Sequence, residues 1–317
     1  MQAQGATSPR GSRVRNAFFA MTLLAIVPMA FAQAPPAAAG GTLDRIRETG
    51  RIRLGYRADA RPLSYRDESG NAAGYSVALC QAVVEATKAE LGAGALAVEW
   101  VPVTAESRFG ALQAGEIDLL CGAETVTLAR RAEVSFSIPT FPGGVGALVR
   151  ADATARFKEV LAGREQAFRP TWRANAGQVL QTKKFTVVAG TTAEKWLADK
   201  RKELDLVSEV ATTNSYEAGL GLVLDREADA FFGDRVLLLG VATRSPSAKE
   251  LIVLDRLFTV EPLALALARG DEAFRLVVDR TLSRLYASGE IGELYAKWCG
   301  EPDESTLAFF RMSALPD

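Results

Sequence analysis

The feature that most constrains the fold is the alternation of short apolar strands with helices in the first half of the chain. Residues 52–56 alternate side chains as a strand does, and 96–102 forms a second predicted strand. The helices predicted between and after them cover 77–91 and 105–114, and a third strand follows at 117–121. Strands separated by helices usually lie parallel in one sheet. The order therefore predicts an α/β fold with parallel neighbouring strands.

Composition excludes several classes of function. The 317 residues carry a formal charge of −1 and are 48% hydrophobic, enough for one large core or two smaller ones. A charge so near zero argues against nucleic acid as a partner. The chain has no histidine, the commonest general base and metal ligand, and its three cysteines lack zinc-site spacing. We therefore expect neither a metal nor a cofactor.

The N-terminus has the pattern of a secretory signal peptide over residues 1–32. Three arginines precede an apolar run at 17–31, which is too short for a comfortable membrane span, and Ala30 and Ala32 flank a suitable cleavage junction. Residues 33–42 then read as a flexible leader. An uncleaved membrane anchor is the alternative. We expect a soluble periplasmic protein, in an oxidising compartment.

The stretch 115–141 has the pattern of a carboxylate-binding site. The strand 117–121 is followed by a small-residue turn, the hydroxyl of Thr125 and a short helix containing Arg130. Backbone N–H groups at such a turn can bind an anion, and a guanidinium can hold both oxygens of a carboxylate. The alternative is an ordinary strand–helix connection with solvated arginines.

These residues resemble a known family. The element Thr125-x-Thr127-x-x-Arg130, preceded by Gly55-Tyr56-Arg57 and Gly74-Tyr75-Ser76, is similar to motifs of the periplasmic amino-acid-binding proteins, the polar amino acid class of solute-binding proteins. The ending S-G-E-I-G-E-L-Y-A-K-W resembles the last helix pair of that family. The likeness covers about residues 43–300 and is greatest to the branch that binds glutamate and aspartate.

The resemblance implies a two-lobed α/β fold of the periplasmic binding protein type (type II-like), with two chain crossings between the lobes. Lobe 1 is expected to comprise 43–150 plus 262–317, and lobe 2 to comprise 151–261. The ligand is expected between the lobes.

The resemblance also implies a set of ligand-binding residues. Arg130, helped by Thr125, corresponds to the group that holds the ligand α-carboxylate, and Thr191 and Thr192 correspond to a second cradle for it. Asp234 corresponds to the partner of the α-ammonium group. For each there is a plainer interpretation, in which Thr191 is only a helix N-cap and Asp234 only a turn residue.

Two further arginines, Arg57 and Arg108, match residues that hold a side-chain carboxylate in the glutamate and aspartate branch. If both are buried and unpaired, the site demands a second negative charge on its ligand. The alternative is that either arginine forms a salt bridge within the protein. The sequence departs from the branch at Ala105 and Ala123, where serine is usual, and at Tyr216, where histidine is usual.

We therefore expect a monomeric receptor that captures an amino acid, with glutamate or aspartate as the predicted ligand, and delivers it to the permease of an ABC importer. We do not expect an enzyme. One alternative is a dehydratase-like enzyme on the same fold, with Glu124 as general acid. Another is a receptor that presents its ligand to a signalling partner.

The cysteines allow one disulfide. Cys80 lies early in the helix after Tyr75, and Cys121 ends the central strand of the same predicted lobe. A helix packed on that sheet can bring the two Cα atoms within disulfide range. We expect a Cys80–Cys121 bond with Cys299 free; the alternative is three buried thiols.

Overall fold

The computed structural model describes residues 41–164 and 176–316. The predicted signal peptide and most of the predicted leader lie outside these residues. Within the described chain, no helix is long and apolar enough to cross a bilayer.

The structure contains helices and strands in alternation. The helices are α1 (Thr42–Thr49), α2 (Tyr75–Leu91), α3 (Arg108–Gln113), α4 (Leu128–Arg131), α5 (Ala155–Ala162), α6 (Ala176–Gln181), α7 (Thr192–Glu203), α8 (Tyr216–Leu224), α9 (Arg235–Arg244), the 3-10 helix η1 (Ala248–Glu250), α10 (Glu272–Ser288), α11 (Glu290–Cys299) and α12 (Glu304–Ser313). The strands are β1 (Arg51–Arg57), β2 (Asp59–Ala60), β3 (Ser64–Arg66), β4 (Ala72–Ala73), β5 (Ala97–Val103), β6 (Leu119–Thr125), β7 (Ser135–Phe136), β8 (Phe141–Gly143), β9 (Val145–Arg150), β10 (Lys184–Val188), β11 (Glu209–Thr213), β12 (Ala230–Asp234), β13 (Leu251–Val253) and β14 (Glu261–Leu267).

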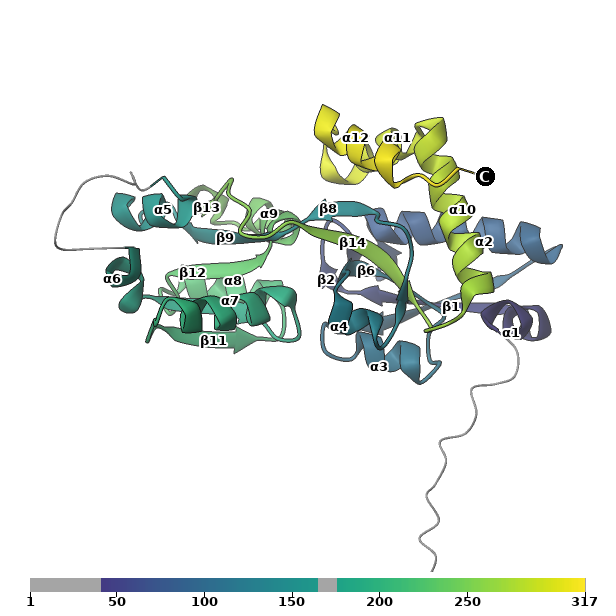
Figure 1. Cartoon of the computed structure of the whole chain (residues 1–317), viewed down its shortest axis with the longest axis horizontal. Coiled ribbons are helices and arrows are strands. Elements are labelled where there is room, and N and C mark those ends of the chain that lie inside the picture. Colours follow the sequence, from purple (N-terminus) through teal and green to yellow (C-terminus); the bar gives the residue numbers. More distant parts are fainter. Residues whose placement is uncertain (1–40, 165–175, 317) are drawn as a thin grey trace, which may run out of the picture. The chain divides into compact units, whose positions relative to one another are not determined.

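The first sheet has the strand order β5-β1-β6-β14-β7, with β8 also paired to β14. Strand β1 lies parallel to both β5 and β6, as the alternation of strands and helices predicts. Strand β14 returns late in the chain and pairs antiparallel with β6. Helices α2 and α10 cover one face of this sheet, and α3 lies against the other (Figure 1).

Strand β14 shows how one strand serves both faces. Leu263, Leu265 and Leu267 are buried in the core that includes α2 and α10. Ala264 and Ala266 point the other way, into the smaller core beside α3. Successive side chains of a strand face opposite sides, so an uninterrupted apolar strand is the pattern expected of a sheet buried on both faces.

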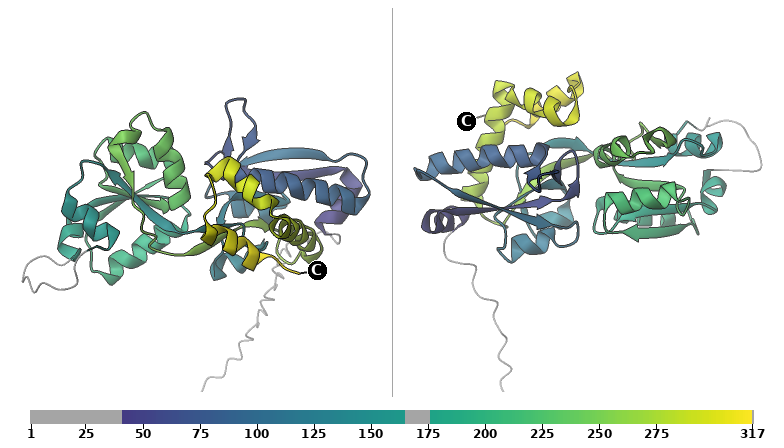
Figure 2. Two further views of the ribbon diagram at one scale, coloured as in Figure 1. Left: turned by 90° about the horizontal axis from the view of Figure 1, so that it is seen from above. Right: turned by 180° about the vertical axis from the view of Figure 1, so that it is seen from behind.

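The second sheet repeats this architecture with the strand order β11-β10-β12-β9-β13. Strand β10 is parallel to β11 and β12, and β9 is antiparallel to β12 and β13. The rings of Phe185 and Phe232 pack on the face covered by α5 and α7, whereas Phe231 packs on the face covered by α8. Figure 2 shows helices on both faces of this sheet.

The chain crosses between the sheets in two places. Strand β8 pairs with β14 in the first sheet, and β9 pairs with β12 in the second, so the first crossing lies at Gly144. We predicted this boundary after residue 150 and assigned 145–150 to lobe 1; β9 instead belongs to the second sheet. The second crossing lies between β13 and β14, near the predicted residue 262. The run V-G-A-L-V-R suits a buried strand in either sheet, and the sequence does not reveal which one.

A disulfide ties α2 to the first sheet. Cys121 lies on the face of β6 that meets α2, Cys80 lies in α2, and both are fully buried. Their Cα atoms are 6.1 Å apart and the structure joins their sulfur atoms. Cys299 is free, and burial raises the pKa of its thiol to about 12.

We expect the double substitution Cys80→Ala/Cys121→Ala to lower the free energy of unfolding by about 2–4 kcal/mol, because the bond closes a loop with a sequence separation of 41 residues. Urea unfolding of oxidised wild type and variant measures the difference. Cys299→Ala is the control. It leaves the disulfide loop closed, so it should not lower the free energy of unfolding through loss of that loop. Three alkylatable thiols in denatured, non-reduced wild type would show that the bond does not form.

Candidate functional site

The residues predicted to bind ligand gather where the parallel strands of both sheets end. Arg57 ends β1, Thr125 ends β6 and Asp234 ends β12. The carboxyl ends of strands are where open α/β sheets place their ligands. A cavity of about 20 Å³ lies among these ends. It is lined by all nine predicted residues, Arg57, Arg108, Ala123, Thr125, Arg130, Thr191, Thr192, Tyr216 and Asp234, together with Ala193 and Leu237.

Arg57 is buried, and it is paired within the protein. Its Nε and Nη2 donate to the two carboxylate oxygens of Asp59, at 2.8 and 2.9 Å. Burial alone would lower the pKa of the Arg57 guanidinium, but the hydrogen bond and charge of Asp59, together with smaller effects of Glu124 and Tyr216, outweigh burial, and the pKa is raised. The backbone N–H of Arg57 donates to the hydroxyl of Ser64, which fixes the end of the strand.

Arg108 is likewise buried and paired. Its Nε donates to Oε2 of Glu124, whose side chain is completely excluded from solvent. Its Nη2 donates to the carbonyl oxygen of Gly190 at 3.2 Å. In the part of the chain that the structure describes, Arg108 Nη1 and Glu124 Oε1 have no hydrogen-bond partner. The pair therefore has one donor and one acceptor atom still unsatisfied.

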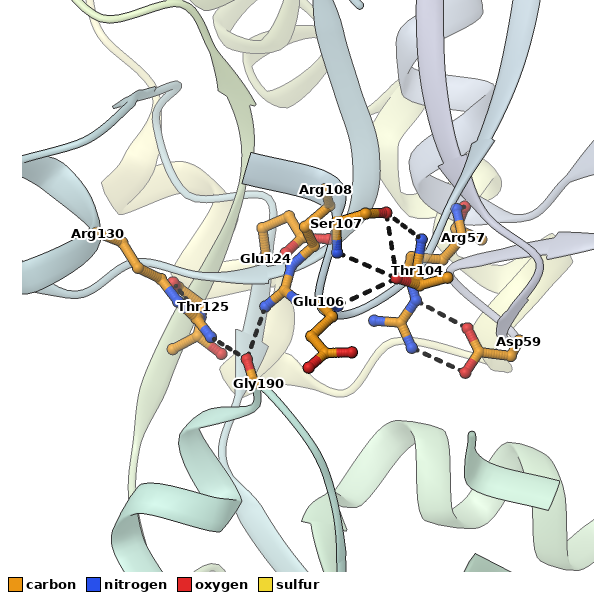
Figure 3. A network of polar contacts seen from close by, with 11 residues as sticks. Arg57, Asp59, Thr104, Glu106, Ser107, Arg108, Glu124, Thr125, Arg130 and Gly190 are labelled. Atoms are coloured by element: carbon orange, nitrogen blue, oxygen red, sulfur yellow. Dashed lines mark hydrogen bonds and ion pairs between the residues drawn. The ribbon is translucent and has the colours of Figure 1, made fainter. Parts of the chain in front are cut away.

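Arg130 differs because it contacts neutral groups. Its Nη1 donates to the carbonyl oxygen of Thr125 at 2.9 Å and its Nη2 to that of Gly190 at 3.2 Å (Figure 3). Burial and the nearby charge of Arg108 lower the pKa of the Arg130 guanidinium to about 10, although Glu124 acts in the opposite direction. Thr127 caps α4 by accepting a hydrogen bond from the Arg130 backbone N–H, which positions the side chain.

Asp234 faces the cavity from the second sheet. Burial, followed by the negative charge of Glu261, raises the pKa of its carboxyl group to about 7. Its Oδ1 has no hydrogen-bond partner among the described residues. Its backbone N–H donates to the hydroxyl oxygen of Tyr216 at 3.1 Å, which leaves the Tyr216 O–H free to donate. Burial and the charge of Asp234 raise the pKa of Tyr216.

The hydroxyl groups of α7 are in use. Thr191 caps this helix by accepting from the backbone N–H of Glu194, so the plainer interpretation of Thr191 applies at least in part. Its hydroxyl also donates to the carbonyl oxygen of Val188. The Thr192 hydroxyl donates to Glu261 at 2.7 Å. Of this helix, Thr192 and Ala193 line the cavity, and N–H groups at these first two positions have no partner within a helix.

The sequence interpretation missed Asp59 and Gly190. Asp59 stands two residues after Arg57, a spacing that places both side chains on one side of extended backbone, so the pair could have been anticipated. The Gly190 carbonyl accepts from both Arg108 and Arg130, and nothing in the sequence indicates that contact. Because Arg57 and Arg108 both have carboxylate partners, the premise of two unpaired arginines does not hold.

Comparison with known proteins matches this chain to solute-binding proteins. The model of the bacterial extracellular solute-binding proteins, family 3, matches residues 52–301. An L-glutamate/L-aspartate-binding protein of Pseudomonas aeruginosa is 32% identical over 267 residues, covering 83% of this chain and 81% of the relative. A glutamate/aspartate import solute-binding protein of Escherichia coli is 28% identical over 287 residues, covering 90% and 88%.

Solved structures are similar over most of the chain. An ancestral amino acid-binding protein, described as a precursor of cyclohexadienyl dehydratase, has a TM-score of 0.65 at 27% identity, covering 82% of this chain and 100% of that one. A cysteine-binding protein from Campylobacter jejuni has a TM-score of 0.66 at 22% identity, covering 84% and 96%. The second likeness concerns the fold alone.

We expect Asp234→Asn to be more stable than wild type at pH 8, where the buried Asp234 carboxylate is ionised. The rise of the Asp234 pKa from 3.8 to about 7 corresponds to up to about 4 kcal/mol, at about 1.4 kcal/mol for each pKa unit. The pKa of about 7 exceeds that of an unfolded aspartate, so the folded state binds more protons between about pH 4 and 7. The stability that depends on Asp234 therefore falls as the pH rises through this window.

Urea unfolding at a series of pH values measures this effect, with the exposed Asp255→Asn as the control. A stability difference between Asp234→Asn and wild type that is the same at pH 4 and pH 8 would contradict the assignment.

Proposed function

Because the chain belongs to the bacterial extracellular solute-binding proteins of family 3, we propose that it captures an amino acid in the periplasm and delivers it to an ABC importer. The family match and the identity of the relatives support this role. Binding rather than catalysis is the activity of the named relatives, so the family favours a receptor over an enzyme.

The observation that carries the proposal is that two opposite charges at the cavity, Arg130 and Asp234, form no ion pair in the part of the chain that the structure describes. Arg130 donates only to neutral carbonyl groups, and its pKa is lowered to about 10. Asp234 has an unsatisfied oxygen, and its pKa is raised to about 7. Each group is shifted toward its neutral form, as burial without a counter-charge requires. An amino acid zwitterion supplies both partners: its carboxylate pairs with Arg130 and its ammonium group with Asp234.

Neighbouring groups would complete the recognition of the α-carboxylate and the α-ammonium group. The backbone N–H groups at the start of α7 add donors and a favourable helix dipole for the carboxylate. The α-ammonium group has three donors, and Asp234 Oδ1 is an unsatisfied acceptor for one of them. Such contacts use only the groups common to all amino acids.

Binding an amino acid requires the site to widen. The cavity of about 20 Å³ has room for about one water molecule. The Gly190 carbonyl oxygen, which receives hydrogen bonds from Arg108 and Arg130, takes up donors that a ligand carboxylate would use. We therefore expect ligand binding to replace the Gly190 contacts and to move the β10–α7 turn away from the two arginines.

The names of the relatives make glutamate and aspartate the first ligands to test. They also support an import system as the partner. The ligand side chain would lie toward Arg57 and Arg108, because Arg130 and Asp234 are used by the α-groups.

Two alternative functions differ from import in what happens to the bound ligand. A dehydratase-like enzyme is favoured by the likeness to the ancestral protein described as a dehydratase precursor. However, Glu124, the candidate general acid, does not line the cavity, and its Oε2 accepts from Arg108. Turnover assays test this alternative. A receptor that presents its ligand to a signalling partner uses the same site, and partner capture with the ligand-loaded protein distinguishes it from an importer component.

We expect calorimetry on ligand-stripped protein to detect one or more amino acids, and Arg130→Ala or Asp234→Ala to weaken the binding by about 2–5 kcal/mol, since each leaves a charged ligand group unpaired. Arg131→Ala is the matched control for the first variant, because Arg131 is exposed on the same helix and does not line the cavity. Asp255→Asn is the control for the second.

Failure of every amino acid to bind folded, stripped protein would reject the proposal. Equal affinity in the Arg130 and Arg131 variants would reject the assigned site while leaving the receptor function intact.

A further inference from the structure

The arginines that face the ligand side chain already have negative partners. Asp59 accepts two hydrogen bonds from Arg57, at 2.8 and 2.9 Å, in the bidentate geometry of a strong guanidinium–carboxylate pair. Glu124 forms an ion pair with Arg108, and both side chains are at most 3% exposed. Neither charge is therefore available in full to a ligand.

The site has no excess of positive charge when these pairs are counted. Its cations are Arg57, Arg108 and Arg130, and its anions are Asp59, Glu124 and Asp234 (Figure 3 labels all but the last). Glu261, which accepts from Thr192 and whose charge acts on Asp234, adds a further negative charge. A zwitterion with a neutral side chain leaves the net charge of the site unchanged. A ligand with a side-chain carboxylate adds one negative charge that no cation of this group is free to compensate once Arg130 has paired with the α-carboxylate. Burying such a carboxylate is unfavourable, because the loss of hydration is not recovered.

We propose that Asp59 and Glu124 are internal counter-ions that determine specificity, so that the site takes amino acids with a neutral amide side chain in preference to the corresponding acids. The inference rests on the proposed function. Asp59 and Glu124 already use donors that a ligand carboxylate could otherwise use, namely Nε and Nη2 of Arg57 and Nε of Arg108.

Hydrogen bonding favours an amide for a second reason. Ionised Asp59 and Glu124 only accept hydrogen bonds, and a guanidinium only donates. A primary amide has an oxygen that can accept from an arginine and an NH₂ group that can donate to a carboxylate. A ligand carboxylate offers acceptors alone, and it adds a negative charge near the carboxylates that Arg57 and Arg108 already hold, although Asp59 and Glu124 do not themselves line the cavity. Glutamine and asparagine therefore match the two neutralised arginines better than glutamate and aspartate.

The arrangement is fixed by the backbone. A Cβ atom on Gly122 would collide with Oε1 of Glu124, so any other residue at position 122 would require the carboxylate to move. Asp59 is held next to Arg57 by strand β2, which pairs with β3, and the hydroxyl of Ser64 in β3 accepts from the Arg57 backbone. Both counter-ions are therefore positioned by main-chain structure.

Calorimetry on ligand-stripped protein with glutamine, asparagine, glutamate and aspartate tests the inference. In wild type we expect the amide of each pair to bind at least tenfold more tightly than the acid. Asp59→Asn should free Arg57 and shift the acid-to-amide affinity ratio toward the acid by about tenfold to a hundredfold. Glu124→Gln should do the same through Arg108, with thermal unfolding used to confirm that this buried variant folds.

Asp152→Asn is the matched control, because Asp152 forms its ion pairs with Arg150 and Arg226, neither of which lines the cavity. It should leave the ratio unchanged. Tighter binding of the acids in wild type, or a ratio that Asp59→Asn does not change, would overturn this inference alone. If no amino acid binds, the proposed function falls with it.

Discussion

The ion pair of Arg108 and Glu124 is the interaction on which the arrangement of the site depends. Neither group can be buried alone at acceptable free energy, and removing one partner of such a pair destabilises a protein by about 3–5 kcal/mol. Glu124 comes from the end of β6 and Arg108 from the start of α3, so the pair locks that helix onto the first sheet. With its Nε held by Glu124, the guanidinium directs Nη2 to the carbonyl of Gly190, in the turn that follows β10 of the second sheet. One fixed pair thus connects the first sheet to a loop of the second.

The two sheets supply different chemistry to the same place. Strand ends of the first sheet contribute Arg57 and Thr125, and α4 adds Arg130, so this side offers mainly donors. The second sheet contributes Asp234 and the start of α7. A ligand that carries both a carboxylate and an ammonium group gains contacts with each sheet. A ligand with only one of these groups gives less stabilisation to the conformation in which both sheets contact it. A ligand can shift an equilibrium between two conformations only by the difference in its affinity for them.

The alternation of strands and helices, with Arg57 and Asp234 at strand ends, followed from local patterns in the sequence. The two-lobed architecture and the set of residues lining the cavity were instead implied by the resemblance to the family, and β6 runs on to Thr125, beyond the predicted strand end at residue 121. The pairing of Arg108 with Glu124 did not follow from either. Whether Arg108 meets a ligand or Glu124 depends on a distance across the fold, and the sequence is compatible with either. The first crossing was misplaced for a similar reason, since β9 is equally apolar as a strand of either sheet.

A motif shows that an arginine is present, but not whether the protein already pairs it, and this affects how ligands are assigned from motifs. An arginine at a given position predicts an acidic ligand only if its charge is free, and that depends on residues outside the motif. Here Asp59 and Glu124 remove that freedom from Arg57 and Arg108. The pKa of Arg57 is raised against burial, chiefly by Asp59, whereas burial and the charge of Arg108 lower the pKa of Arg130. Arg130 and Asp234, which form no ion pair within residues 41–164 and 176–316, are the charges that match the α-groups of any amino acid. The charges that remain unpaired thus indicate the class of ligand. The counter-ions that the protein itself provides indicate which ligand side chain the site prefers.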